Sequence, residues 1–61
     1  MTNWHLISLP HGWTECERYG NAIIAERDGR YCGFAVRYDT RKCDTIATCR
    51  TLIDNCINEG L

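Results

Sequence analysis

The 61-residue chain is long enough for one small domain with a marginal core, because a chain of this length buries only about 60% of its unfolded surface. With 44% hydrophobic and 25% charged residues, its composition is that of a globular protein and excludes disorder of the whole chain. Seven basic and eight acidic side chains give a formal net charge of −1, which argues against non-specific nucleic-acid binding, where phosphate contacts supply most of the affinity.

The N-terminal region carries no sign of secretion or of a membrane anchor. It has no basic segment followed by a long apolar run, and no stretch is long and apolar enough to span a bilayer. We therefore expect a cytoplasmic protein that forms a single domain over residues 1–61. Its five cysteines are expected to be reduced, and no membrane partner is expected.

Two segments precede the first strong turn. The apolar residues 4–9 are ended by Pro10 and predict an edge strand or an extended arm laid over the domain. The polar residues 13–19 predict a second short strand or a structured loop. A strand there would run antiparallel to the next segment, because Gly20-Asn21 is a strong turn signal.

Residues 22–38 predict a β-hairpin around Asp28-Gly29. That dipeptide suits a type I′ turn, which needs positive φ at both central positions. Such a turn places Arg27 opposite Arg30, and the alternation of side chains then defines two faces of the hairpin. One face is apolar throughout and consists of Ile23, Ala25, Cys32, Phe34 and Val36.

A third strand is expected at residues 42–46, antiparallel to 30–38, followed by a helix at 48–59. In the helix, apolar residues recur at i, i+3, i+4, i+7 and i+8, which is the pattern of one buried face. Thr48 is the expected N-cap and Gly60 the expected C′ residue. The predicted fold class is α+β: an antiparallel sheet of three to five strands, with the C-terminal helix packed on the apolar hairpin face.

The opposite sheet face has an apolar or small centre and charged ends. It comprises Ile24, Glu26, Tyr31, Gly33, Ala35, Arg37 and, with the third strand in register, Ile46. The N-terminal arm, a protein partner or a second copy of the chain in a homodimer would cover it. The residues expected to contact a partner are Trp4, Ile24, Tyr31, Arg37, Arg41 and Lys42.

The five cysteines lack the Cys-x-x-Cys spacing of structural zinc and redox sites. Cys49 and Cys56 lie on the apolar helix stripe and Cys32 on the apolar hairpin face, so we expect them to act as small hydrophobic residues without a metal or cofactor. Two alternatives remain open. The first is a zinc site drawn from Cys16, Cys32, Cys43, His5 and His11, and the second is a disulfide among Cys32, Cys43 and Cys49.

No catalytic constellation is visible. Cys16 lies near His11 in the sequence, but a catalytic thiol needs activation and a positioned base, and this chain has little room for a pocket of ~300 Å³. The carboxylates are scattered, and Arg37 is expected to form a cross-strand ion pair with Asp44. We therefore predict a protein that is not an enzyme.

The hairpin, third strand and threonine-capped helix at residues 22–27, 30–38, 42–46 and 48–59 resemble two classes of DNA-binding domain. These are the arm-site-binding domains of tyrosine integrases and the plant ethylene-response-factor domains. The resemblance is architectural, covers about two-thirds of the chain, and implies DNA reading by the exposed sheet face. The residues concerned would be Glu26, Tyr31, Ala35 and Arg37.

In its size, compactness and cytosolic character, the chain also resembles small phage and mobile-element proteins, including anti-CRISPR proteins. Many of these act by binding a host protein. The leading hypothesis is therefore a non-catalytic protein-binding module that inhibits or modulates a host or defence protein. The alternatives are a small nucleic-acid-binding domain using Arg37, Arg41 and Lys42, and a zinc-stabilised adaptor.

Overall fold

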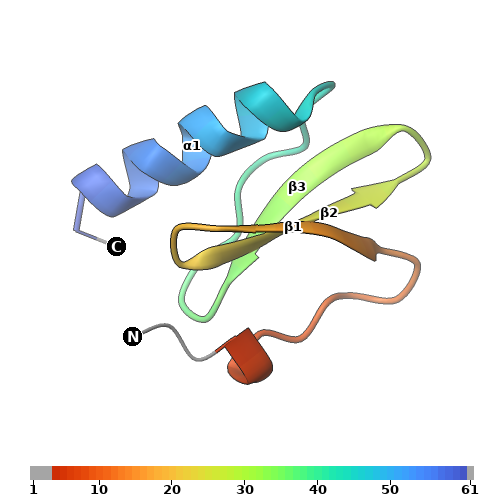
Figure 1. Ribbon diagram of the computed structural model, residues 1–61, viewed down its shortest axis with the longest axis horizontal. Coiled ribbons are helices and arrows are strands. Elements are labelled where there is room, and N and C mark those ends of the chain that lie inside the picture. Colours follow the sequence, from red (N-terminus) through yellow and green to blue (C-terminus); the bar gives the residue numbers. More distant parts are fainter. Residues whose placement is uncertain (1–3, 61) are drawn as a thin grey trace.

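The chain builds one sheet that is covered on both faces, as a computed structural model describing residues 4–60 shows (Figure 1). A short 3-10 helix, η1 (Trp4–Leu6), precedes strands β1 (Thr14–Tyr19), β2 (Ala22–Arg27) and β3 (Arg30–Ala35). Helix α1 (Ile46–Asn58) follows. The strands are antiparallel in the order β1-β2-β3, so the α+β fold is confirmed, with three strands.

The hairpin of β2 and β3 has the predicted turn and register. Asp28 and Gly29 adopt φ values of 52° and 79°, and Arg27 pairs with Arg30. The Gly29 amide also donates to Glu26 Oε2 at 2.8 Å, which closes the turn from one side. However, β3 ends at Ala35 and not at Tyr38, because the chain reverses there and the Ala35 amide donates to the Tyr38 carbonyl at 2.8 Å.

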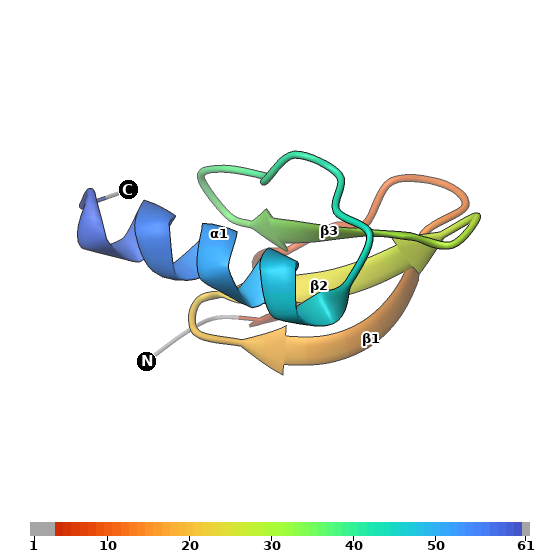
Figure 2. The same ribbon diagram turned by 90° about the horizontal axis from the view of Figure 1, so that it is seen from above.

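The segment 39–43 runs back beside β3 in place of the predicted strand 42–46 (Figure 2). Only isolated bridges form, between Phe34 and Asp39 and between Tyr31 and Cys43. Between them the Thr40 hydroxyl accepts from the Gly33 amide at 2.9 Å, and the Thr40 amide donates to the Gly33 carbonyl at 2.8 Å. A side chain thus satisfies a strand amide that a regular ladder would pair with backbone.

Helix α1 begins two residues earlier than predicted. Thr45 is the N-cap, in an extended conformation, and its side chain accepts from the Thr48 amide at 3.2 Å. Thr48 therefore lies inside the first turn and is not the cap. At the other end the helix stops at Asn58, and Gly60 has the left-handed φ of 82° that the predicted C′ role requires.

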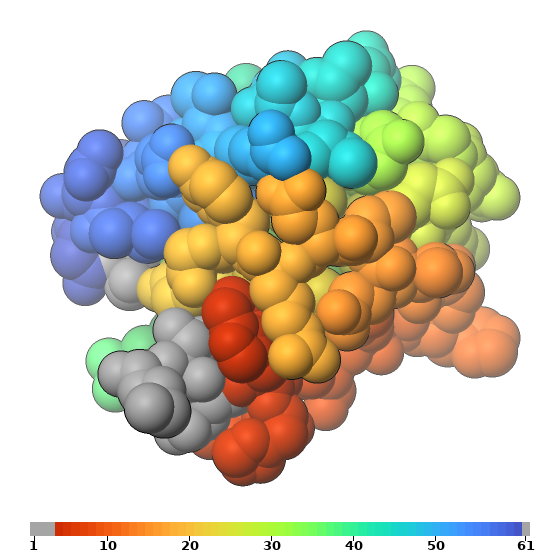
Figure 3. All heavy atoms as spheres, in the orientation of Figure 1, coloured from red at the N-terminus to blue at the C-terminus, as the bar shows by residue number. Residues whose placement is uncertain are grey.

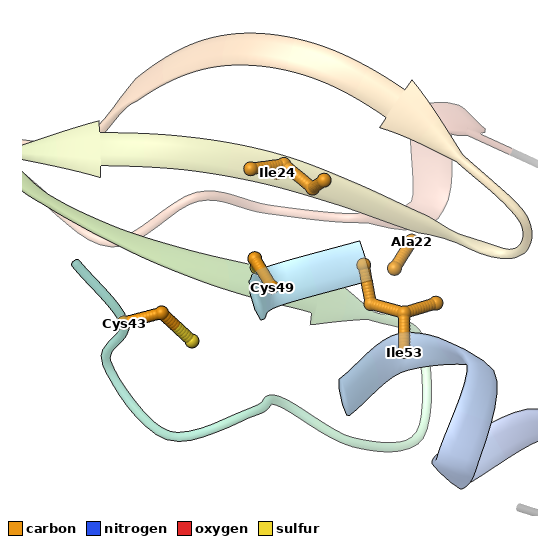
Figure 4. Close-up of a cluster of buried hydrophobic side chains, with 5 residues drawn as sticks. All are labelled: Ala22, Ile24, Cys43, Cys49 and Ile53. Carbon is orange, nitrogen blue, oxygen red and sulfur yellow. The ribbon is translucent and has the colours of Figure 1, made fainter. Parts of the chain in front are cut away.

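The helix packs on the opposite sheet face from the one predicted. Its buried residues Cys49 and Ile53 form the helix-side core with residues of the other face and of the return segment (Figure 4). The helix-side core consists of Ala22, Ile24, Cys43, Cys49 and Ile53. The cause lies at Gly33, where an added Cβ would be 2.9 Å from both Cγ1 and Cδ1 of Ile53. The missing side chain is what lets the helix approach this face.

The N-terminal arm, residues 4–13, covers the face that was assigned to the helix. Ile7, Leu9 and Trp13 pack against a second cluster, the arm-side core of Ala25, Cys32 and Phe34. Trp13 meets Phe34 edge-on, with ring centroids 5.3 Å apart. The strand alternative for residues 4–9 is wrong, because η1 and an irregular segment lie there, whereas the alternative of an arm laid over the domain is confirmed.

Polar side chains join the outer strand β1 to the helix. Glu17 accepts two hydrogen bonds from Arg50, at 2.6 and 2.7 Å, and the Tyr19 hydroxyl donates to the Asp54 carboxylate at 3.0 Å. The Arg50 guanidinium also lies 5.9 Å from the centroid of the Tyr19 ring. Since the main contacts between α1 and the sheet involve β2 and β3, this group extends the attachment of the helix to the outer strand.

Substituting Gly33→Ala should lower the free energy of unfolding by about 1–3 kcal/mol, because the new methyl group would overlap Ile53. Urea denaturation measures this loss. In an Ile53→Val background the loss should be smaller, because Cδ1, one of the two closest atoms, is gone. An equal loss in both backgrounds would show that the Cδ1 atom of Ile53 is not a source of the strain.

Substituting Glu17→Gln should lower the melting temperature at neutral pH. The hydrogen bonds from Arg50 hold the pKa of the Glu17 carboxyl below its ordinary value, so this stabilisation is present above the unfolded pKa and is lost as the pH falls. Melting curves from pH 7 to pH 3 should therefore converge. Glu15→Gln, which removes only the exposed pair with Arg18, is the matched control. A difference between Glu17→Gln and wild type that stays constant with pH would contradict this role of the carboxylate.

Candidate functional site

Two of the predicted partner residues are not on a free surface. Ile24 is 0% exposed within the helix-side core, and half-buried Tyr31 packs against the same core. They were expected on an open sheet face, but α1 occupies that face. Since the hairpin is apolar on both sides, alternation alone did not distinguish the two faces. The predicted surface around Ile24 and Tyr31 is therefore an internal packing surface.

Trp4 lies at the edge of the domain, next to β1. Its ring is half-buried, and the Arg18 guanidinium sits 5.7 Å from the ring centroid. Figure 3 shows η1 against the exposed side of β1, consistent with this contact. Trp4 therefore fastens the start of the arm to the outer strand and leaves its neighbour Leu6 56% exposed.

Arg37 lies beyond the end of β3, at a groove between the arm and the 36–39 reversal. This arm groove has a volume of about 320 Å³. It is lined by Ser8, Pro10, Phe34, Ala35, Val36, Arg37, Tyr38 and Asp39. The Val36 side chain is 56% exposed there, next to the exposed Arg37.

Two of the residues that line the arm groove are held in place by contacts with neighbouring elements. The Tyr38 hydroxyl donates to Asn21 Oδ1 in the β1–β2 turn, and burial raises the pKa of the Tyr38 phenol. On the floor, Phe34 is held edge-on by Trp13. The groove is therefore built on rigid elements, with Val36 and Arg37 presented to solvent.

The three cations predicted to act together are separated. Phe34 bridges to Asp39 and Tyr31 to Cys43, so the return segment leads from the far end of β3 back towards its beginning. Arg37 consequently lines the arm groove, whereas Lys42 lies near the hairpin turn and exposed Arg41 lines neither hollow. The expected Arg37–Asp44 pair is likewise wrong, because Asp44 lies 3.4 Å from Arg30.

Lys42 belongs to a second concavity, which sequence reasoning missed. This hairpin hollow has a volume of about 190 Å³ and is lined by Trp13, Arg27, Asp28, Arg30 and Lys42. The register of the turn, which places Arg27 opposite Arg30, was the one feature of the sequence that could have indicated this hollow. Trp13 and Lys42 also line the hollow, and they lie near the turn only because the arm and the return segment pass beside it.

The cysteines lie apart from both concavities. Cys43 and Cys49 belong to the helix-side core (Figure 4). Cys32 donates from its thiol to the Thr40 carbonyl at 2.9 Å. Burial raises the pKa of the Cys32 thiol, and it raises the pKa of Cys49 to about 11. These thiols are thus protonated at neutral pH and pack as small hydrophobic groups.

All five cysteines are free thiols. Over residues 4–60, no three or more His, Cys, Asp or Glu side chains are placed to hold a metal ion. Of the cysteines in the zinc alternative, Cys16 lies exposed on β1, whereas Cys32 and Cys43 are buried. The described residues form two concavities, one with a mixed polar and apolar lining and one rich in cations.

In native protein at pH 8, a disulfide-exchange reagent such as Ellman's reagent should modify Cys16 much faster than Cys32, Cys43 or Cys49. Cys16 is exposed, whereas the other three are buried. In urea all five thiols should react. Mass spectrometry of peptides would locate the modified sites. Cys16→Ser should remove the fast phase at that site, and fast modification of Cys32, Cys43 or Cys49 would contradict their burial.

Comparisons of the chain with protein-family models, with curated proteins and with solved structures found no match. Across the described residues, none of the helices has the length and apolar character needed to cross a membrane. The assignment of function therefore rests on the geometry of the two concavities.

Proposed function

We propose that the protein is a non-catalytic protein-binding module whose contact surface is the arm groove. The observation that supports this is the exposure of Val36, 56%, at the mouth of a groove of about 320 Å³ that also presents Arg37. Arginine is a typical anchor of protein interfaces, and an exposed apolar side chain beside it adds apolar area that binding can bury.

The chemistry of the groove favours a protein partner over a nucleic acid. Its lining is mixed, with Pro10, Phe34 and Val36 beside polar groups, and its single cation, Arg37, is accompanied by the carboxylate of Asp39. Within residues 4–60 no carboxylate lies within ion-pair distance of Arg37. Such a groove suits an apolar side chain of a partner followed by an acidic residue, which would engage the guanidinium.

The most specific form of this proposal is an inhibitor or modulator of a host or defence protein. A small domain acts in this way by covering a surface that its target needs, and it requires no chemistry of its own. The hydrogen bond of Tyr38 and the packing of Trp13 on Phe34 hold the residues of the groove in place. This supports such a role, because little conformational entropy is then lost on binding.

Photo-crosslinking tests the proposed surface. A benzophenone amino acid at Val36 should give one discrete protein adduct in cells that naturally express the chain, and nuclease should not remove it. The same group at Asn55, exposed on α1, should give none. In the crosslinking variant, Arg37→Glu should abolish the adduct, whereas Arg41→Glu, an equal charge reversal outside the groove, should preserve it.

Three results would overturn the proposal. Equal adducts at Val36 and Asn55 would show non-specific capture, and a nuclease-sensitive adduct would identify a nucleic acid. An adduct of twice the chain mass would identify a homodimer in place of a separate target.

A further inference from the structure

The hairpin hollow concentrates positive charge in a chain whose formal net charge is −1. Three of its five lining residues are the cations Arg27, Arg30 and Lys42. One carboxylate, that of Asp28, also lines it, but that side chain is 89% exposed and extends into solvent from the turn. The local excess of cations favours an anionic ligand.

The donors of these cations are only loosely engaged. Arg27 Nε lies 3.7 Å from Asp28 Oδ2, and Arg30 Nε lies 3.4 Å from an oxygen of Asp44. Neither pair has hydrogen-bond geometry, unlike the two short hydrogen bonds between Arg50 and Glu17. Among the described residues, Lys42 has no carboxylate within 4.0 Å. Most of the donors on the three side chains therefore remain available to a ligand.

Trp13 gives the hollow an aromatic wall with a fixed orientation. Its ring is held edge-on against Phe34, at an interplanar angle of 74°, and its amide donates to the Pro10 carbonyl at 3.2 Å. Next to it, Gly12 has no side chain, and the Arg27 guanidinium carbon lies 3.7 Å from where a Cβ would be. The Arg27 side chain therefore lies close to the backbone of Gly12, the residue before Trp13.

We propose that the hairpin hollow binds the phosphomonoester of a planar heterocycle, that is, a nucleoside monophosphate or the 5′-phosphorylated end of a single strand. Arg27, Arg30 and Lys42 would hold the phosphate, and the base would lie against Trp13. At about 190 Å³ the hollow is smaller than pockets that enclose whole ligands, so it takes the phosphate end. This site is distinct from the arm groove and does not depend on the proposed function.

The test uses the fluorescence of Trp13 in a Trp4→Phe background, where it is the only remaining tryptophan. The probes are adenosine monophosphate, adenosine and inorganic phosphate, with calorimetry as a second readout. Adenosine monophosphate should change the emission saturably and bind about tenfold more tightly than either fragment, because it makes both kinds of contact.

Charge variants locate the site. Lys42→Gln and Arg30→Gln should each weaken binding of adenosine monophosphate, by about fivefold or more. Asp28→Asn should strengthen it, since it removes a repelling charge from the lining, and asparagine tolerates the positive φ at this position. Glu59→Gln makes the same change of charge at the exposed end of the helix and should leave the affinity unchanged. Circular dichroism confirms that each variant is folded.

Two further ligands distinguish the possible sources of the phosphate. Tighter binding of a 5′-phosphorylated oligonucleotide than of the mononucleotide would assign the strand end, and the reverse order would assign the free nucleotide. Equal binding of adenosine and adenosine monophosphate would overturn the proposal. A phosphoserine peptide that binds as tightly as the mononucleotide would overturn the role of Trp13, and unchanged affinity in both charge-removing variants would overturn the roles of Arg30 and Lys42.

Discussion

The close approach of Ile53 to Gly33 decides the layout of this small domain. A helix settles on a sheet only where the side chains leave it room, and the residue in the middle of β3 has none. Once α1 occupies that face, Phe34 is left on the other, where only the arm can cover it. The two concavities follow from this division, because both lie where the arm borders the hairpin.

The local elements of the fold were predictable, and their assembly was not. Asp28-Gly29 specified the turn and its register through a requirement for positive φ, which few residues meet. The spacing of apolar residues likewise specified a C-terminal helix. Which sheet face the helix would cover was not specified, since Ile23 and Ile24 are equally apolar neighbours on opposite faces. The informative residue was Gly33, whose lack of a side chain marks the face approached by another element.

The candidate site was predictable only in part, for a related reason. Arg37 was correctly expected at an exposed position, but the groove that surrounds it depends on the arm, whose path has no periodic pattern. Ile24 and Tyr31 were placed on the surface because the helix was placed on the wrong face. The hairpin hollow depends on Lys42, which reaches the turn only because the Thr40 hydroxyl replaces one backbone acceptor and keeps the return segment against β3.

The two concavities differ in how much of the chain each requires. The arm groove needs the arm and the reversal after β3, and Phe34 belongs both to its lining and to the arm-side core. The hairpin hollow needs only the turn, one residue of the arm and one of the return segment. Changes that loosen the arm would therefore affect the groove more than the hollow, whose two arginines are set by the turn itself.

The irregularity in β1 has a consequence for the open edge of the sheet. The register between β1 and β2 shifts between Glu15 and Glu17, so Cys16 is an extra residue without a partner in the strand pair. A bulge of this kind twists a strand and interrupts the row of amides and carbonyls that another chain would need for pairing. The flanking carboxylates add repulsion between identical edges. The bulge thus protects the protein from edge-to-edge aggregation, a risk for any short sheet whose outer strand is uncovered.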